Sequence, residues 1–211
     1  MKKYLTVLLL TALTVCPAGI PAISSSVDDK TTYTKKEVEL RLAMRELFTD
    51  NLVWMRIYAN ALVADDQPAA EKARMRLWVN ENGMRAIFKQ FYDNETSGKL
   101  PSLISIYMGI LPEFIDIAKR ERDTSDIESR IKEKSDMLGE FFARANMNWD
   151  KSAISAMFSK YHELLRNEIK AQVKTPKSFD TQALDATFGQ AKLVADTLTL
   201  GIMKHHPEKL W

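Results

Sequence analysis

Cysteine is nearly absent from this chain of 211 residues, with Cys16 as its one example. If the N-terminal segment that holds Cys16 is removed, the mature protein has no disulfide, no thiol nucleophile and no cysteine metal ligand. Haem attachment through C-x-x-C-H is excluded, because the motif cannot occur here. The folded chain is therefore expected to be held together by its apolar core alone.

Glycine and proline are scarce, with seven of each. There is no G-x-S-x-G turn and no glycine-rich phosphate loop, which argues against a hydrolase, a kinase or a sugar transferase. The net charge is only +2, and no segment interleaves lysine and arginine with aromatic residues, so a nucleic-acid partner is not expected. These absences favour a non-enzymatic protein without a cofactor.

The first residues have the pattern of an export signal. Two lysines precede the apolar stretch 4–15, which is too short to span a bilayer comfortably. Small residues suited to cleavage follow, near Ala22 or Ser24. We predict a signal peptide over residues 1–24 of a bacterial protein that is periplasmic or secreted, with a short membrane anchor as the alternative. Lipid attachment at Cys16 is disfavoured, because Val15 precedes it.

The remainder predicts an all-α protein. A disordered linker over 25–34 is expected to lead into a single helical-bundle domain over 35–211, with no transmembrane helix in the mature chain. Apolar residues after residue 30 recur at helical spacing, and Ala, Leu, Lys, Glu, Arg and Met dominate the composition. The pattern predicts about six helices in an up-down bundle, which group into three similar hairpins at a spacing of roughly fifty-odd residues.

Helix ends are marked by capping residues and breakers. Thr34 to Glu37 and Ser125 to Glu128 both have the spacing of a capping box. We expect a loop over 93–99 and a third helix from about Leu100 to Arg122, with a kink at Pro112.

Polar residues interrupt the apolar stripes at related places. Asn51, Tyr107 and Tyr161 take corresponding positions in the odd-numbered helices, and Gln190 is one of several in the even-numbered ones. A buried carboxylate needs a partner, and Arg56 could supply a counter-charge. The set predicts a ligand pocket between helices or, alternatively, a satisfied network that fixes helix register. The candidate ligand-binding residues are Asn51, Arg56, Asn80, Tyr107, Glu113, Asp136, Tyr161 and Asp196.

The C-terminal stretch VADTLTLGIMKHHPEKLW suggests a histidine metal site at first sight. Adjacent helical residues point about 100° apart, so His205 and His206 cannot easily chelate one ion together. The Glu-x-x-His pattern of bundle metal sites is also missing. We expect the two histidines to close a helix that Pro207 stops.

Several motifs in their order resemble a group of uncharacterised bacterial helical-bundle proteins. They are LFTDNLVWMR, RLWVNENGM and the A-D-x-L-x-x-G-I pattern from Ala195 to Ile202. Members of that group often carry automatic labels such as acetylglutamate kinase or glycosyltransferase, which these residues do not support. The group tends to have histidine near the places of Asn51, Tyr107 and Tyr161, so a metal site built on those histidines would be lost here. The matching residues are Trp54, Arg56, Asn80, Asp196 and Gly201.

Three functions remain open. The first is an exported, non-enzymatic bundle that binds a protein partner or a small ligand. The second is a divalent-metal-binding bundle, in which carboxylates and imidazole suit the ion. The third is an envelope stress or chaperone-like protein, which predicts a contiguous exposed apolar patch. The ligand pool for the metal is Asp136, Asp196, Glu113, Glu168 and His162.

Overall fold

Six long helices run through the residues that the structure, a computed structural model, describes, which are 32–175 and 180–211. No strand occurs in these residues, so the all-α prediction is confirmed. The predicted signal peptide and most of the linker lie outside the described residues. Residues Tyr33–Trp211 form one compact unit. The elements are α1 (Lys35–Val63), α2 (Gln67–Phe88), α3 (Asn94–Lys119), α4 (Ser125–Ala145), α5 (Lys151–Lys174), α6 (Thr181–His205) and the 3-10 turn η1 (Pro207–Lys209).

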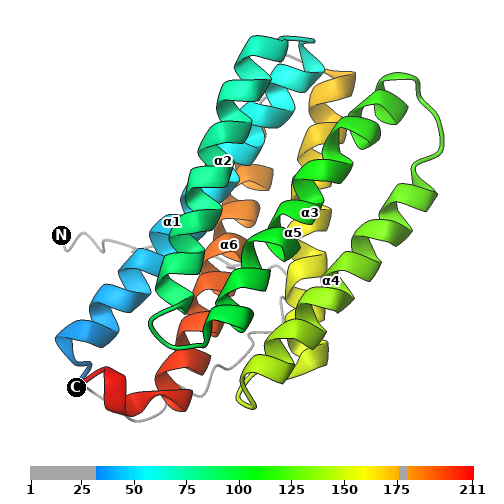
Figure 1. The fold of residues 1–211 in the computed structure, drawn as a ribbon. Coiled ribbons are helices and arrows are strands. Elements are labelled where there is room, and N and C mark those ends of the chain that lie inside the picture. The colour runs from blue at the N-terminus through cyan, green and yellow to red at the C-terminus, as the bar shows by residue number, and fades with distance from the viewer. Residues whose placement is uncertain (1–31, 176–179) are drawn as a thin grey trace, which may run out of the picture. The chain divides into compact units, whose positions relative to one another are not determined.

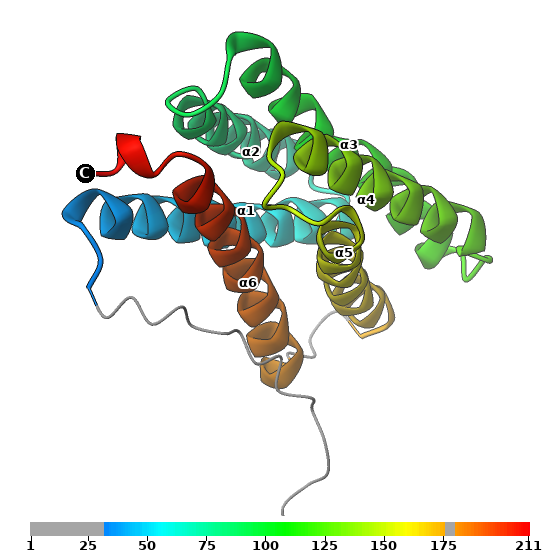
Figure 2. The ribbon, with the colours of Figure 1, turned by 90° about the horizontal axis from the view of Figure 1, so that it is seen from below.

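Consecutive helices run in opposite directions, as expected of an up-down bundle (Figure 1). The helices α1, α3 and α5 pack against one another in the centre. Each even-numbered helix lies over the groove between two of them: α2 on α1 and α3, α4 on α3 and α5, α6 on α5 and α1 (Figure 2). The three hairpins therefore form a ring, in which every even-numbered helix keeps one outward face.

Side-chain caps fix most of the helix starts. Thr34 accepts a hydrogen bond from Glu37 N and completes the predicted capping box before α1. Asp66 and Asp150 accept from the third residue of α2 and α5 in the same way. Each cap satisfies a backbone N–H that has no partner inside its helix.

Two local predictions were wrong. Residues 94–99 are the first turns of α3 and not a loop, because Asp93 caps Thr96 N and starts the helix early. The second capping box does not form, because α4 has Thr124 at its N-cap and the Thr124 hydroxyl bonds Glu128 instead of a backbone N–H. Pro112 lies inside α3, as expected, and the helix continues past it; the kink stays a prediction.

Two glycines let neighbouring segments approach closely. A Cβ at Gly139 of α4 would lie 2.6 Å from the carbonyl oxygen of Lys151, at the start of α5. A Cβ at Gly201 of α6 would lie 1.8 Å from Trp149 Nε1. Trp149 is buried against Phe142, with ring centroids 5.2 Å apart. These two contacts bind α4 to α5 and α6 to the turn that precedes α5.

Among the described helices, α3 alone is long and apolar enough to cross a membrane by length and composition. A helix at the centre of a bundle meets the same criterion. Only 35% of its most apolar window is buried inside the bundle, so much of this apolar helix reaches the surface.

Candidate functional site

The interior contains an aromatic layer built from α3, α4 and α5. The ring of Tyr107 stacks on His162, with centroids 4.5 Å apart, and Tyr161 lies beside the same imidazole at 5.7 Å. His162 Nδ1 lies 3.1 Å from the hydroxyl of Ser135. All four side chains are buried. The structure therefore brings two of the predicted site residues together, around a histidine between them.

The hydroxyls of Tyr107 and Tyr161 have no hydrogen-bond partner among the described residues. Burial raises the pKa of both phenols, so both stay neutral at physiological pH. An unpaired buried hydroxyl costs about 1–3 kcal/mol. The two hydroxyls therefore offset part of what the buried, stacked rings contribute, and neither phenol is activated as a base.

His162 should make stability depend on pH. Burial and then the nearby charge of Arg166 lower the pKa of His162 to about 3. An unfolded chain has a histidine pKa near 6.5. Between these two values the unfolded chain binds a proton that the folded chain does not, so stability falls as the pH falls from 6.5. We expect the free energy of unfolding to be about 2 kcal/mol lower at pH 5 than at pH 7.

Urea unfolding of wild type and His162→Gln at pH 7, 6 and 5 checks this expectation. The difference between the two proteins isolates His162 from other groups, such as Glu81, whose pKa is raised by burial. His205→Gln is the control, since that imidazole is exposed. A parallel pH dependence of wild type and His162→Gln would contradict the assignment.

A second polar layer connects α1, α5 and α6. Arg56 pairs with Glu168, and the Glu168 carboxylate also accepts a hydrogen bond from Thr187. The two charged side chains are 15% and 7% exposed. Burial lowers the pKa of Arg56. Arg56 is therefore the counter-charge that the sequence predicted, and Glu168 is its partner.

Two hairpins are closed by the same kind of hydrogen bond. Asn80 of α2 donates to the carbonyl of Leu47 on α1 at 2.7 Å. Gln190 of α6 donates to the carbonyl of Met157 on α5 at 2.9 Å. These carbonyls come four residues before Asn51 and Tyr161, which are both buried. The bonds therefore occupy equivalent places and join the two helices of each hairpin.

The hairpin of α3 and α4 lacks this closure within the described residues. The equivalent carbonyl belongs to Leu103, four residues before Tyr107, and no side chain of α4 donates to it. Asp136, predicted to take the related place, instead pairs with Lys132 at 3.1 Å on the surface. Leu103 lines a cleft of about 450 Å³ between α3 and α4. The other residues that line it are Thr96, Lys99, Met137, Glu140, Phe141, Arg144 and Ala145.

Three of the candidate ligand-binding residues lie at the surface or the edge of the bundle, away from the interior layers. Glu113 and Asp136 are each 49% exposed and pair with Arg130 and Lys132. Asp196 lies at the edge of the bundle, where Arg45 on α1 holds both of its oxygens at 2.8 and 2.5 Å.

The proposed metal ligands also lie apart. Glu113, Asp136, Asp196 and Glu168 each bind a different cationic side chain. Within the part of the chain that the structure describes, no group of three or more metal-ligating residues forms. The structure therefore does not assemble the predicted ligand pool.

The C-terminal histidines close α6 as predicted. The helix ends at His205, and Pro207 begins η1. Both rings pack on Tyr92, at 6.3 and 5.2 Å between centroids. These contacts are structural and bring the end of α6 against the α2–α3 turn.

One buried carboxylate was missed. Glu81 of α2 is 3% exposed and accepts a hydrogen bond from Ser105 of α3 at 2.5 Å. Desolvation raises its pKa, although this hydrogen bond opposes the rise. The burial of Glu81 could have been predicted from the sequence, because Leu77, Glu81 and Met84 follow the spacing of an inward-facing helix stripe.

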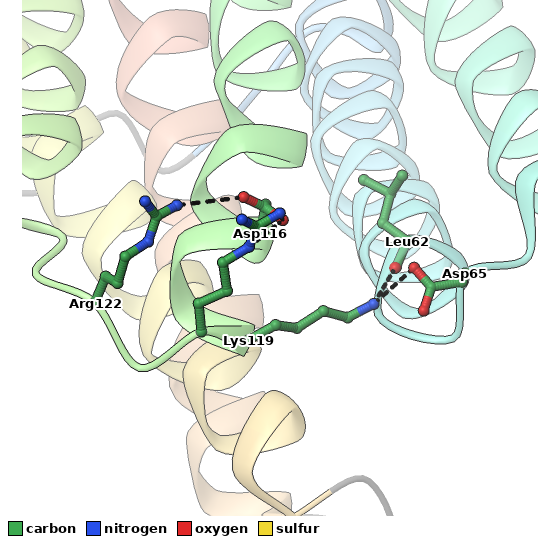
Figure 3. A network of polar contacts seen from close by, with 6 residues as sticks. Leu62, Asp65, Asp116, Lys119 and Arg122 are labelled. Atoms are coloured by element: carbon green, nitrogen blue, oxygen red, sulfur yellow. Dashed lines mark hydrogen bonds and ion pairs between the residues drawn. The ribbon is translucent and has the colours of Figure 1, made fainter.

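The polar network at one end of α1 and α3 is a surface connection (Figure 3). Lys119 donates to the carbonyl of Leu62 at 3.2 Å and to Asp65 at 2.8 Å. Asp65 has a φ of 58° and is 83% exposed. The ion pair from Asp116 to Arg122 lies on the same surface. Exposed pairs of this kind contribute little to stability.

Similarity to other proteins supplies no function. Comparison of the chain with models of protein families, with curated proteins and with solved structures found no match. The resemblance to uncharacterised helical-bundle proteins therefore stays a prediction, and the function has to be inferred from geometry.

Proposed function

We propose that the protein is an exported, non-enzymatic helical bundle that binds a small amphiphilic molecule in the cleft between α3 and α4. The observation that carries the proposal is the missing closure of this hairpin. Equivalent places in the other two hairpins are joined by the bonds of Asn80 and Gln190. The part of the proposal that concerns export rests on the residue pattern of 1–24.

The cleft has an apolar floor and a charged rim. Leu103, Met137 and Phe141 supply the floor. Lys99 and Arg144 stand on the rim, where each pairs with a glutamate of its own helix. Exposed ion pairs are weak, so a ligand head group can exchange with the glutamates. A volume of about 450 Å³ suits a small molecule rather than a folded partner.

The packing of α4 explains why the cleft is open. Gly139 allows α4 to lie directly on the start of α5, where its missing side chain makes room for Ser155 and Lys151. Ser135, one turn earlier, faces His162 of α5. α4 is thus fixed to α5, and its other edge leaves the apolar surface of α3 partly uncovered.

Binding of an amphiphilic probe tests the proposal. We expect anilinonaphthalene sulfonate to bind the purified protein saturably and to be displaced by dodecanoate. Met137→Ser should weaken binding about tenfold, because it removes apolar contact area from the floor. Ala145→Trp should abolish it by filling the cleft. Met147→Ser is the matched control, since Met147 is 89% exposed and lies outside the cleft.

The same three variants also give the outcome that would contradict the proposal. Equal affinity in wild type, Met137→Ser and Ala145→Trp would place the probe elsewhere on the molecule. Circular dichroism of each variant establishes that loss of binding is not loss of fold.

A further inference from the structure

The outward face of α2 carries the largest group of adjacent exposed apolar side chains on one turn of a helix. Met75, Trp78 and Val79 are 61%, 64% and 50% exposed. Their spacing of three and four residues puts them on one side of the helix. Together with Lys72, Arg74 and Arg76 they line a shallow hollow of about 620 Å³.

Positive charge predominates around this face. Every charged residue that lines the hollow is a lysine or an arginine. Glu71, the exposed carboxylate of α2, is paired with Arg74 at 2.7 Å, and Glu81 is buried on the inner side. Arg76 stays on the apolar side, where its guanidinium lies 5.1 Å from the ring centre of Trp54.

The other even-numbered helices differ in this respect. On the outward side of α4, lysine and acid alternate, and Lys132 pairs with Asp136. On α6, the exposed Leu193 and Leu200 stand seven residues apart, with Asp196 between them. Among the described outward faces of α2, α4 and α6, that of α2 alone combines three clustered apolar residues with an excess of positive charge.

We propose that the outward face of α2 docks on an anionic lipid surface. A helix with a basic rim and an apolar face lies in the plane of a membrane interface, where tryptophan is favoured between head groups and acyl chains. The inner face of α2 packs on α1 and α3, so the bundle holds the helix with its backbone already satisfied. Anionic head groups would neutralise Lys72 and Arg76, and Arg74 can exchange its Glu71 partner for a head group.

An acidic polypeptide is a weaker candidate for this surface. Peptides bind in a groove between elements or along a sheet edge. The side chains here come from one helix, α2, and form a hollow on its outward side, not a groove between two elements. A broad and deformable surface such as a bilayer fits that shape better. This inference is independent of the ligand cleft, which lies between α3 and α4, so either can fail without the other.

Vesicle co-sedimentation tests the inference with the whole protein, purified from cells that export it. We expect binding to vesicles that contain phosphatidylglycerol, weak binding to pure phosphatidylcholine, and loss of binding at high salt. Trp78→Ser should weaken binding about tenfold by removing apolar area, and Val79→Ser should weaken it in the same direction. Lys72→Gln should weaken binding about fivefold.

Matched controls separate this face from general adhesion. Trp211 is 76% exposed and Lys192 lies on the exposed side of α6, so Trp211→Ser and Lys192→Gln should leave binding unchanged. Any contribution of the N-terminal residues is the same in all variants and cancels in the comparison. Full binding by Trp78→Ser and Val79→Ser would overturn the inference, as would equal binding to both kinds of vesicle. Binding of polyglutamate in solution that Trp78→Ser weakens as strongly as it weakens vesicle binding would also overturn it, in favour of an acidic protein partner.

Discussion

Replacing Glu168 with alanine is expected to lower the free energy of unfolding by about 3 kcal/mol. The change leaves Arg56 in the interior without its carboxylate, and it removes the acceptor for Thr187. Removing one partner of a buried ion pair costs more than the pair itself contributes, because the remaining charge stays desolvated. Chemical denaturation at pH 7 measures the loss.

Two further variants make this result specific. Glu113→Ala removes a carboxylate that is 49% exposed and paired with Arg130, so it should cost less than about 1 kcal/mol. The double change Arg56→Met with Glu168→Leu should recover much of the stability, since it replaces both charges by apolar groups. Equal losses for Glu113→Ala and Glu168→Ala would show that the interior pair has no special role.

The second large effect is expected at the two close glycine contacts. Gly139→Ala should lower the free energy of unfolding by about 2–3 kcal/mol, because its methyl group meets the backbone oxygen of Lys151 at 2.6 Å and α4 must move away from α5. Gly201→Ala should cost about as much, because the indole of Trp149 has to leave its place in the aromatic core.

Gly189 is the matched control for both substitutions. It also lies inside a helix, but a Cβ there would meet nothing within 4 Å. Gly189→Ala should therefore stabilise the protein by about 0.5–1 kcal/mol through helix propensity and the unfolded state. Thermal and urea unfolding of the three variants give the comparison. If Gly189→Ala lowered the free energy of unfolding as much as Gly139→Ala and Gly201→Ala, the close contacts at Gly139 and Gly201 would not be the cause of their losses.

The titratable groups of the interior are held neutral or paired, and they fix the positions of the helices. His162 is held neutral, burial raises the pKa of the three buried phenols (Tyr58, Tyr107 and Tyr161), and Arg56 is paired with Glu168. The groups that could exchange partners lie at the surface, along the α3–α4 cleft and on α2. Binding at the surface is therefore better supported than reaction in the core.

Much of the site could be read from apolar spacing, but only to within one residue. Asn51, Tyr107 and Tyr161 were correctly placed in the interior. The correspondence between hairpins failed at Asp136, where the neighbour Ser135 faces inward. It failed again at Glu113, where Phe114 is the buried residue. A shift of one residue turns a side chain by about 100°, enough to move it from core to surface.

The sequence by itself determined the number of helices, their order and most of their ends. Apolar spacing and caps such as Thr34 and Asp150 are local properties, and they act before any two helices meet. The start of α3 was the exception. Ser97 and Leu100 are buried there, so tertiary packing supports helix across a stretch that reads as a loop.

Only the tertiary structure decided which charges pair and where the bundle stays open. Asp196 pairs with Arg45, and Glu168 pairs with Arg56, because of how helices far apart in the sequence are rotated against one another. The residues of each pair are more than a hundred positions apart in the chain. The cleft beside Leu103 lies between α3 and α4, and α4 packs closely on α5 at Gly139, a contact between two hairpins. Such features depend on the relative rotation and distance of packed helices, and local sequence does not specify either.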